Sequence, residues 1–542
     1  MRKFLLFAAV ALIGLAQTVE RGANVATFHS DIDDSDQAYA LYVPQGYTSS
    51  RAWPLVVSLH GEGSSPQANL QQVFGLGTLP GRPSRAFPDL EYLVASPVAR
   101  GDIGYDGIGE KDVLAVMAEV KRRFRVDEDR VYLTGISRGG GGALALALRR
   151  PDLWAAIAVV CPVVPPGLES LSGNALHLPV RFMQGELDPI VPAAQTRAWH
   201  QRFLDAGVRS EYVEYESIRH NAWDIAYKGG TIFQWFGQYQ RIEKPSRVQL
   251  TADTYLHSSA YWLQFSGLTP GTPASADAEI LDGRLAVRTS GLNGFRIDRR
   301  RTPAPPTSVS VDGRVIAMSA GTRANSLGFL KENGVWKPAR SGPGGLQKGP
   351  GAEGPLAAAI AERHFYVYGT EGQPATDELI RRREVAVAAA KWSAGLERPA
   401  LRFRVVSDVE SVDIPLADSS LVLFGTRSSN NRIAAYANRL PLHLSDSAAD
   451  YGLVYVFPVD GRYVVVSSGL PWWTRADQVR RAGVPSVAPP WKTLQSFGDF
   501  ILFRGGLDQV LAEGRFDNEW RLPITAAAAM RATGAVEITE RP

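Results

Sequence analysis

One serine stands in the sequence setting that nucleophilic catalysis requires. Ser137 is the centre of GISRG at residues 135–139, which follows a β-type run at 131–134 and precedes a helical run. A G-x-S-x-G pentapeptide between a strand and a helix is typical of a nucleophile elbow. Its glycines permit a turn so tight that Cβ atoms would collide there, and the strained turn projects the serine Oγ outward. An ordinary glycine-rich turn is the alternative, but the flanking strand and helix favour a nucleophile.

A serine hydroxyl is a weak nucleophile, so it needs a base and a carboxylate that orients the base, in the chain order Ser, acid, His. His220 lies in a loop that follows a predicted strand at 210–215. Asp188 follows a predicted strand at 180–185, and catalytic groups gather at the carboxyl ends of strands in open α/β sheets. We therefore predict Ser137, Asp188 and His220 as nucleophile, acid and base.

Other histidines and acids fit this order less well. His200 lies within a helical run, where packing or surface exposure is the better interpretation, and His177 precedes every plausible acid. Asp205 and Asp224 both fall in helical contexts. Asp188 alone would be interpreted as an Asp-Pro turn, and only its place between Ser137 and His220 favours a catalytic role.

Acyl chemistry through a serine also requires N–H donors for the oxyanion, each contributing roughly 3 kcal/mol. The backbone N–H of Arg138, next to the nucleophile, is one candidate. The second comes from the loop HGEG at 60–63, where we favour the N–H of Glu62 and keep Gly61 as the alternative. His60 is expected to organise this loop.

These residues need a sheet to position them. Between residues 36 and 240, short β-type runs alternate with helical runs at 110–124 and 142–150, which predicts a mostly parallel sheet covered by helices, the α/β class. From 247 to 345 the alternating β pattern predicts a small β-sandwich-like module. Residues 355–542, with a long helix at 377–395, predict a C-terminal α/β region of unknown role.

Composition and the N-terminal segment limit the possible partners and location of the protein. The 58 basic and 55 acidic residues give a net charge of +3, too small to indicate a nucleic-acid partner. Residues 1–20 have the basic start and apolar run of a signal peptide, and the 13 apolar residues at 4–16 are too few to span a bilayer. We expect a secreted or periplasmic protein without a membrane span in its mature form. A buried N-terminal helix is the alternative.

Two further predictions concern cofactors and cross-links. The sequence contains no H-E-x-x-H motif and no cysteine cluster, so we predict no metal and no cofactor. Cys161 is the single cysteine, which excludes an intramolecular disulfide. Trp472 and Trp473 could stack on sugar rings or a polymer, but packing is the more common role of paired tryptophans.

The N-terminal part resembles a known family, the secreted esterases and prolyl-oligopeptidase-like hydrolases that include feruloyl esterases and polyhydroxybutyrate depolymerases. The similar segments occur in the family's order at residues 39–47, 53–63, 99–162, 184–192 and 220–227. The resemblance implies an alpha/beta-hydrolase catalytic domain at 30–243. It also implies the roles given above for Ser137, Asp188 and His220, and a pocket for the acyl or alcohol group lined by Tyr105.

The chain departs from the family's usual pattern at two charged residues. Arg138 stands where such proteins often carry an apolar or neutral residue, and Glu62 is a charged residue in the predicted oxyanion loop. A backbone donor does not depend on its side chain, so we expect catalysis to survive. The hypothesis that follows is a preference for a polar or charged substrate.

The functional prediction is hydrolysis of carboxylic esters, on a small-molecule or polymeric substrate. The segment between Cys161 and Leu178 is too short for a large lid, and export suits extracellular substrates. A prolyl-oligopeptidase-like serine peptidase is the first alternative, although no site for a charged terminus or a proline ring is evident. A catalytically inactive binding or scaffold protein is the second, and the complete set of Ser137, Asp188 and His220 argues against it.

Overall fold

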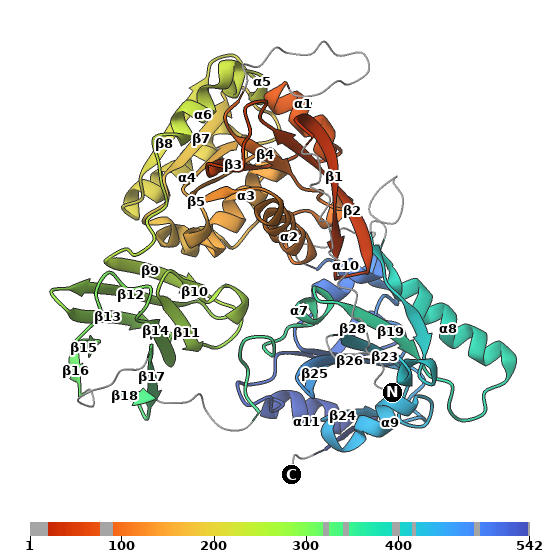
Figure 1. Cartoon of the computed structure of the whole chain (residues 1–542). Coiled ribbons are helices and arrows are strands. Elements are labelled where there is room, and N and C mark those ends of the chain that lie inside the picture. Colours follow the sequence, from red (N-terminus) through yellow and green to blue (C-terminus); the bar gives the residue numbers. More distant parts are fainter. Residues whose placement is uncertain are drawn as a thin grey trace, which may run out of the picture.

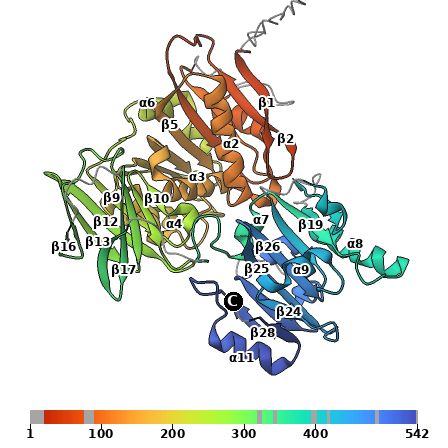
Figure 2. The ribbon, with the colours of Figure 1, turned by 60° about the horizontal axis from the view of Figure 1, so that its bottom comes forward.

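The chain folds into three parts, each with its own sheets. The computed structural model describes residues 20–75, 90–317, 325–339, 346–392, 401–414, 419–481 and 488–539. Figures 1 and 2 show an N-terminal domain at the top, a green β-rich part at the left and a blue C-terminal part at the lower right. The predicted signal peptide lies outside the described residues except for residue 20.

An eight-stranded sheet forms the centre of the N-terminal domain, in the order β1-β2-β4-β3-β5-β6-β7-β8. β1 and β2 are antiparallel, as are β2 and β4, and the other neighbours are parallel. The strands are β1 (Gly22–Ser30), β2 (Ser35–Val43), β3 (Trp53–Leu59), β4 (Leu93–Ser96), β5 (Val126–Ile136), β6 (Ala156–Val160), β7 (Val180–Gly185) and β8 (Ser210–Tyr215). This mostly parallel sheet confirms the predicted α/β class.

The sequence pattern located most of this sheet but missed its first strand. β7 and β8 have the predicted bounds, 180–185 and 210–215. In β1, by contrast, half-buried and exposed residues alternate over most of the strand, because it lies at the sheet edge and pairs only with β2. An edge strand of this kind has little of the apolar periodicity from which strands are predicted.

Helices cover both faces of the sheet, which makes three layers. Alternate residues of a strand point to opposite faces, so Leu55 and Val57 of β3 pack on one side and Val56 on the other. Side chains of α2, α3 and α4 complete the first core, and side chains of α1, α5 and α6 complete the second. The helices are α1 (Pro66–Phe74), α2 (Ile108–Arg123), α3 (Arg138–Arg149), α4 (Ala193–Asp205), α5 (Trp223–Ala226) and α6 (Thr231–Phe236).

Two five-stranded sheets make up the β-rich part, and apolar side chains from both share one core, as in a β-sandwich. One sheet has the order β16-β15-β13-β12-β9 and the other β10-β11-β14-β17-β18. Their strands are β9 (Arg247–Ala252), β10 (Ser259–Ala260), β11 (Leu263–Gly267), β12 (Ala274–Leu281), β13 (Arg284–Ser290), β14 (Gly294–Asp298), β15 (Ser308–Val311), β16 (Arg314–Ile316), β17 (Ser326–Glu332) and β18 (Val335–Ala339).

The C-terminal part contains a mixed seven-stranded sheet of order β22-β19-β23-β26-β25-β27-β28. These strands are β19 (His364–Tyr368), β22 (Val405–Ser407), β23 (Ser420–Phe424), β25 (Tyr451–Val459), β26 (Arg462–Gly469), β27 (Phe500–Arg504) and β28 (Gly506–Gly514). Two short pairs accompany them: β20 (Lys391–Trp392) with β21 (Leu401–Arg402), and β24 (Leu442–Leu444) with β29 (Val536–Ile538). The helices are α7 (Leu356–Ile360), α8 (Thr376–Ala390), α9 (Asn431–Tyr436), α10 (Pro490–Gln495) and α11 (Ile524–Thr533).

The paired tryptophans of this part take packing positions. Trp472 is fully buried, and its indole N–H donates to the carbonyl of Pro490 at 2.8 Å. The ring of Trp473 packs edge-on against it, with centroids 4.9 Å apart. The burial of Trp472 therefore favours the packing interpretation over a platform for sugar rings.

A buried ion cluster joins the N-terminal domain to the sandwich. The carboxylate of Glu110 in α2 accepts hydrogen bonds from Arg150 at 2.7 Å and from His257 of the sandwich at 2.9 Å. Burial alone would raise the pKa of Glu110, but these two partners outweigh it and lower the pKa to about 2. The junction between the two parts thus depends on a charged carboxylate with two cationic or hydrogen-bonding partners.

None of the helices in the described part of the chain has the length and apolar character needed to cross a membrane.

Candidate active site

The turn at Ser137 connects β5 directly to α3. Ser137 has φ 51° and ψ −120°, a conformation that non-glycine residues rarely adopt. Glycines make the turn possible: a Cβ on Gly139 would lie 2.5 Å from the carbonyl oxygen of His60, and one on Gly135 would lie 2.9 Å from the backbone nitrogen of Gly140. The strain, of order 1–3 kcal/mol, is typical of functional positions. The structure therefore has the strand–turn–helix geometry that the pentapeptide predicts.

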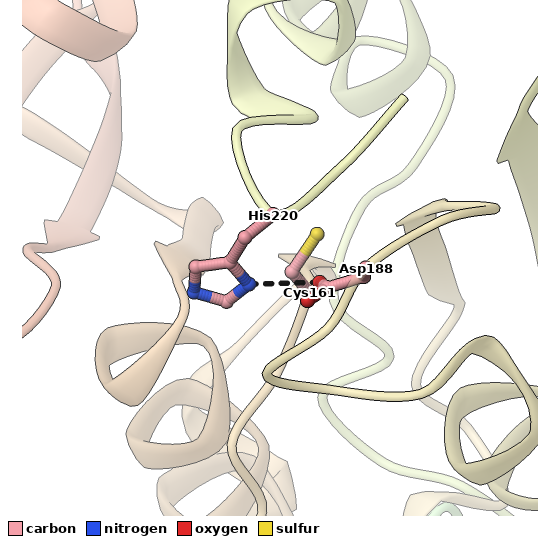
Figure 3. A group of neighbouring side chains, drawn as sticks. All are labelled: Cys161, Asp188 and His220. Carbon is pink, nitrogen blue, oxygen red and sulfur yellow. Dashed lines mark hydrogen bonds and ion pairs between the residues drawn. The ribbon is translucent and has the colours of Figure 1, made fainter. Parts of the chain in front are cut away.

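Ser137, His220 and Asp188 meet above the carboxyl ends of β5, β7 and β8. The Oγ of Ser137 lies 2.9 Å from Nε2 of His220, and Nδ1 of His220 lies 2.8 Å from Oδ2 of Asp188. Figure 3 shows the imidazole pointing its Nδ1 at the Asp188 carboxylate. With the proton on Nδ1, Nε2 is free to accept the serine hydroxyl. This arrangement can take a proton from Ser137 while keeping the imidazole oriented.

Several groups besides His220 donate hydrogen bonds to the Asp188 carboxylate. Its Oδ1 accepts the backbone N–H groups of Ile190 and Val191, both at 2.9 Å, and its Oδ2 also accepts the side-chain amide of Gln184 at 3.0 Å. Burial alone would raise the pKa of Asp188, but hydrogen bonds from Val191, His220, Ile190 and the Cys161 thiol outweigh it and lower the pKa. Asp188 is thus ionised at neutral pH, as the orientation of an imidazole requires.

Gln184 is a positioning residue that the sequence analysis did not find. It is fully buried at the end of β7, and its amide nitrogen also donates to the carbonyl of Val191 at 2.9 Å. Its amide oxygen accepts the hydroxyl of Thr196, from α4, at 2.8 Å. A chain Thr196–Gln184–Asp188 therefore ties the acid to the helix that follows its loop. A glutamine four residues before an acid has no distinctive sequence signal.

The loops that carry Asp188 and His220 are joined along their backbones. The N–H of Glu186 donates to the carbonyl of Tyr215 at 3.0 Å, and that of Leu187 donates to Ile218 at 2.8 Å. Trp223 packs edge-on against the His220 ring, with centroids 5.3 Å apart. The side chain of His220 is only 16% exposed as a result, so its position is set by packing as well as by hydrogen bonds.

The loop predicted to supply an oxyanion donor lies beside the nucleophile. A Cβ on Gly61 would lie 3.6 Å from the Cβ of Ser137. The side chains of Glu62 and Arg138 form an ion pair of 3.7 Å. The loop 60–63 and the start of α3 therefore meet at Ser137, where the two donor groups were predicted. The choice between the N–H groups of Glu62 and Gly61 stays a prediction.

Tyr105 is buried between α3 and the 60–63 loop. It is only 5% exposed, its ring contacts Gly142 of α3, and its hydroxyl donates to the carbonyl of His60 at 3.0 Å. The His60 ring stands edge-on to it at 5.9 Å. The pocket-lining role that the resemblance implies stays a prediction, and in the structure this buried phenol bonds to the 60–63 loop.

The alternative histidines and acids lie elsewhere. His200 is within α4 and bonds to Ser210 at 2.8 Å, and burial lowers its pKa. His177 bonds to the backbone carbonyl of Arg247 at 2.6 Å. Asp205 and Asp224 both belong to helices, α4 and α5. The helical contexts predicted for His200, Asp205 and Asp224 are therefore confirmed.

One more side chain reaches this site. The Sγ of Cys161, a carboxylate oxygen of Asp188 and a ring nitrogen of His220 all lie within 4.8 Å of one another (Figure 3). This is a group of residue types that can bind metals, but here Asp188 and His220 already bond to each other. Acyl transfer from a serine needs no metal at this position.

Comparison with known proteins identifies the class. The model of the prolyl oligopeptidase family matches residues 104–166, which include Ser137. Cutinase 1 of Thermobifida cellulosilytica is 34% identical over 106 residues, covering 20% of this chain and 38% of the cutinase. The cutinase of Thermobifida fusca (strain YX) is 34% identical over 106 residues, covering 20% of this chain and 34% of the cutinase.

A relative with another named activity is matched over a longer stretch. The probable feruloyl esterase C of Aspergillus terreus (strain NIH 2624 / FGSC A1156) is 28% identical over 156 residues, covering 28% of this chain and 56% of that protein. The chain thus spans a third to just over half of the length of these relatives. Fold and matches together support an α/β serine hydrolase.

Proposed function

We propose that this chain is a secreted or periplasmic serine esterase that hydrolyses carboxylic esters through an acyl-enzyme on Ser137. His220 acts as general base and acid, and Asp188 orients it. The substrate is a small-molecule or polymeric ester, and the chemistry needs no cofactor. The observation that carries the proposal is the continuous hydrogen-bond chain from Ser137 through His220 to Asp188, at 2.9 and 2.8 Å, on a strained turn between β5 and α3.

The proposed reaction has two halves. The Oγ of Ser137 attacks the ester carbonyl carbon while Nε2 of His220 takes the hydroxyl proton, and the oxyanion binds the N–H of Arg138 and that of Glu62 or Gly61. Collapse of the intermediate breaks the bond to the alkoxide, which leaves with the proton from His220. Water then attacks the acyl-enzyme with His220 again as base, and the acid and free Ser137 are released. The ionised Asp188 stabilises the imidazolium that forms in each half.

Two kinds of relative support ester substrates: proteins named as cutinases and one named as a feruloyl esterase. The match to the prolyl oligopeptidase family supports a second candidate, a serine peptidase that cleaves after proline. Both activities use the same acyl-enzyme chemistry, so the site geometry does not separate them. The ester proposal leads because the matched esterases extend over longer stretches than the family model.

The proposal is tested with purified full-length protein, its Ser137→Ala variant and a Ser258→Ala control. Ser258 is a buried serine of the sandwich whose hydroxyl donates to the carbonyl of Tyr255 at 2.8 Å. Each protein is assayed on a short-chain nitrophenyl ester and on a prolyl-nitroanilide peptide, and labelled with a fluorophosphonate. We expect ester hydrolysis and labelling by the wild type and the control, and a loss of several orders of magnitude in Ser137→Ala.

Each other outcome has a definite meaning. Cleavage of the peptide, abolished by Ser137→Ala, would replace the esterase with the peptidase. Absence of both activities and of labelling would contradict the proposed chemistry and favour an inactive binding protein. The location is tested separately, by N-terminal sequencing of the protein recovered from the medium and periplasm of the expressing cells. A chain that starts at residue 1 and stays inside the cell would contradict export.

A further inference from the structure

The residue that follows β6 lies beside the acid and the base, in a turn that binds the backbone of the nucleophile. Cys161 comes directly after Val160, the last residue of β6. It is fully buried and has φ 45°, in the left-handed region. That conformation is unusual for a residue that precedes a proline, here Pro162, because extended backbone is favoured there. Strained backbone of this kind persists only where the surrounding contacts determine it.

The turn that contains Cys161 holds the backbone of the nucleophile. The N–H of Ser137 donates to the carbonyl of Val160 at 2.9 Å, and the carbonyl of Ser137 accepts the N–H of Val163 at 3.0 Å. The N–H of Cys161 itself donates to the carbonyl of Met183 in β7 at 2.9 Å. A change in the position of Cys161 would therefore be felt on both sides of Ser137.

The side chain of Cys161 lies beside the acid and the base (Figure 3). Its Sγ lies within 4.8 Å of a carboxylate oxygen of Asp188 and of a ring nitrogen of His220. Burial and the surrounding groups, which include Asp188 and the backbone of Gly185 and Ala222, change the pKa of the thiol. Gly185 ends the strand before the acid, and Ala222 follows the base by two residues. One buried side chain thus lies beside both the acid and the base, while Val160 and Val163 of the same turn bind the backbone of the nucleophile.

We propose that Cys161 is a positioning residue of this site, whose thiol donates to Asp188 and sets the carboxylate against His220. This inference rests on the proposed function, because it assigns Cys161 a part in the same reaction. A thiol is a weak donor, and its sulfur can act as a weak acceptor at the same time. The burial that raises the pKa of Cys161 to about 12 keeps the thiol protonated and able to donate.

The titratable groups around Cys161 determine how removal of its thiol would change the pH profile of the reaction. Besides Asp188 and His220, the titratable groups that interact with Cys161 in the described part of the chain include the phenols of Tyr215 in β8 and Tyr227 after α5, and burial raises the pKa of both. Both phenols are therefore neutral across the working range. The Asp188 carboxylate bonds to the imidazole of His220, so a change in the donors to Asp188 changes how strongly the carboxylate stabilises an imidazolium.

The test compares Cys161→Ala, which removes the donor, with Cys161→Ser, which retains an O–H donor and an acceptor. Ser258→Ala serves as the control, because it removes one buried polar group in the sandwich. For Cys161→Ala we expect kcat on a nitrophenyl ester to fall about three- to tenfold, the loss of roughly one hydrogen bond, with KM unchanged. The acid limb of the kcat/KM profile should move to higher pH by about half a unit, because a carboxylate with one donor fewer binds the shared proton more tightly.

If Cys161 had a purely structural role, Cys161→Ala would lower the melting temperature without moving the acid limb of the kcat/KM profile. We expect Cys161→Ser to restore most of kcat and the wild-type acid limb. An unmoved acid limb in Cys161→Ala, or a Cys161→Ser variant as impaired as Cys161→Ala, would overturn the inference.

A second readout separates this inference from the proposed function. The Nδ1 proton of His220, bonded to Asp188, gives a downfield proton NMR resonance that is independent of turnover. We expect Cys161→Ala to shift this resonance and Cys161→Ser and Ser258→Ala to leave it close to the wild-type position. If the wild type hydrolyses no ester, the proposed function fails while the resonance still decides the role of Cys161. An unmoved resonance in Cys161→Ala would overturn that role.

Discussion

Replacing Gly185 by alanine should separate the base from the nucleophile. Gly185 is the last residue of β7, where the acid loop begins and the base loop crosses it. A Cβ added there would lie 2.6 Å from the carbonyl oxygen of Ile218 and closer still to that of Arg219. Ordinary van der Waals contact begins at 3.4 Å, so backbone must move by about 0.8 Å or more to admit one methyl group.

That displacement falls directly on the catalytic base. Arg219 is the neighbour of His220, and the hydrogen bond from Ser137 to His220 is 2.9 Å long. A shift of close to 1 Å would take this distance out of hydrogen-bonding range. Misplacement by about 1 Å can cost on the order of 10²-fold in rate, so we expect kcat of Gly185→Ala to fall about a hundredfold. Overpacking should also cost about 1–3 kcal/mol of unfolding free energy.

Gly349→Ala is the matched control. A Cβ on Gly349, in the C-terminal part, would have no heavy atom within 4 Å outside its own neighbours, so the same substitution is harmless there. Both variants are compared with wild type by ester kinetics below their melting temperatures, by calorimetry and by the rate of fluorophosphonate labelling. A kcat of Gly185→Ala within twofold of Gly349→Ala would refute the reasoning, whatever the melting temperature.

Three further predictions concern other contacts of the site and of the domain junction. Glu110 has a pKa lowered to about 2 from an ordinary value of 4.5, so its contribution is complete above pH 4.5 and is lost as the pH falls toward 2. We expect the wild type to lose about 3 kcal/mol more unfolding free energy over that interval than Glu110→Gln, as measured by denaturant titration. Thr196→Val removes the hydroxyl that holds Gln184, and should lower kcat about two- to fivefold and stability by about 1–2 kcal/mol, as measured by kinetics and calorimetry. Arg138→Met removes a cation beside the nucleophile, and should reduce kcat/KM for anionic esters about fivefold relative to neutral esters.

Each of these three has an outcome that would contradict it. Parallel pH–stability curves for wild type and Glu110→Gln would mean that protonation of Glu110 does not cause the predicted loss of unfolding free energy. A Thr196→Val variant with wild-type kcat and melting temperature would mean that Gln184 is held without it. An unchanged ratio of anionic to neutral ester rates in Arg138→Met would reject the preference for charged substrates, as expected if Glu62 neutralises the arginine.

The sequence alone located the elements whose signal is local. The turn at Ser137 was predictable because its glycines lie within a few residues of it, and the strand and helix on each side have strong apolar patterns. β7 and β8 were predictable for the same reason. The order of Ser137, Asp188 and His220 along the chain then limited the choice of acid and base to few residues.

Only the tertiary structure could assign the residues that act across distant segments. The roles of Gln184 and Cys161 depend on where α4 and the acid loop lie, and nothing in their own neighbourhoods marks them. The bond from Tyr105 to the 60–63 loop likewise depends on α3, where Gly142 leaves space for the ring. The edge strand β1 was missed because it buries few apolar side chains. Contacts between segments far apart in the chain are set by packing, and packing leaves no local pattern from which to predict them.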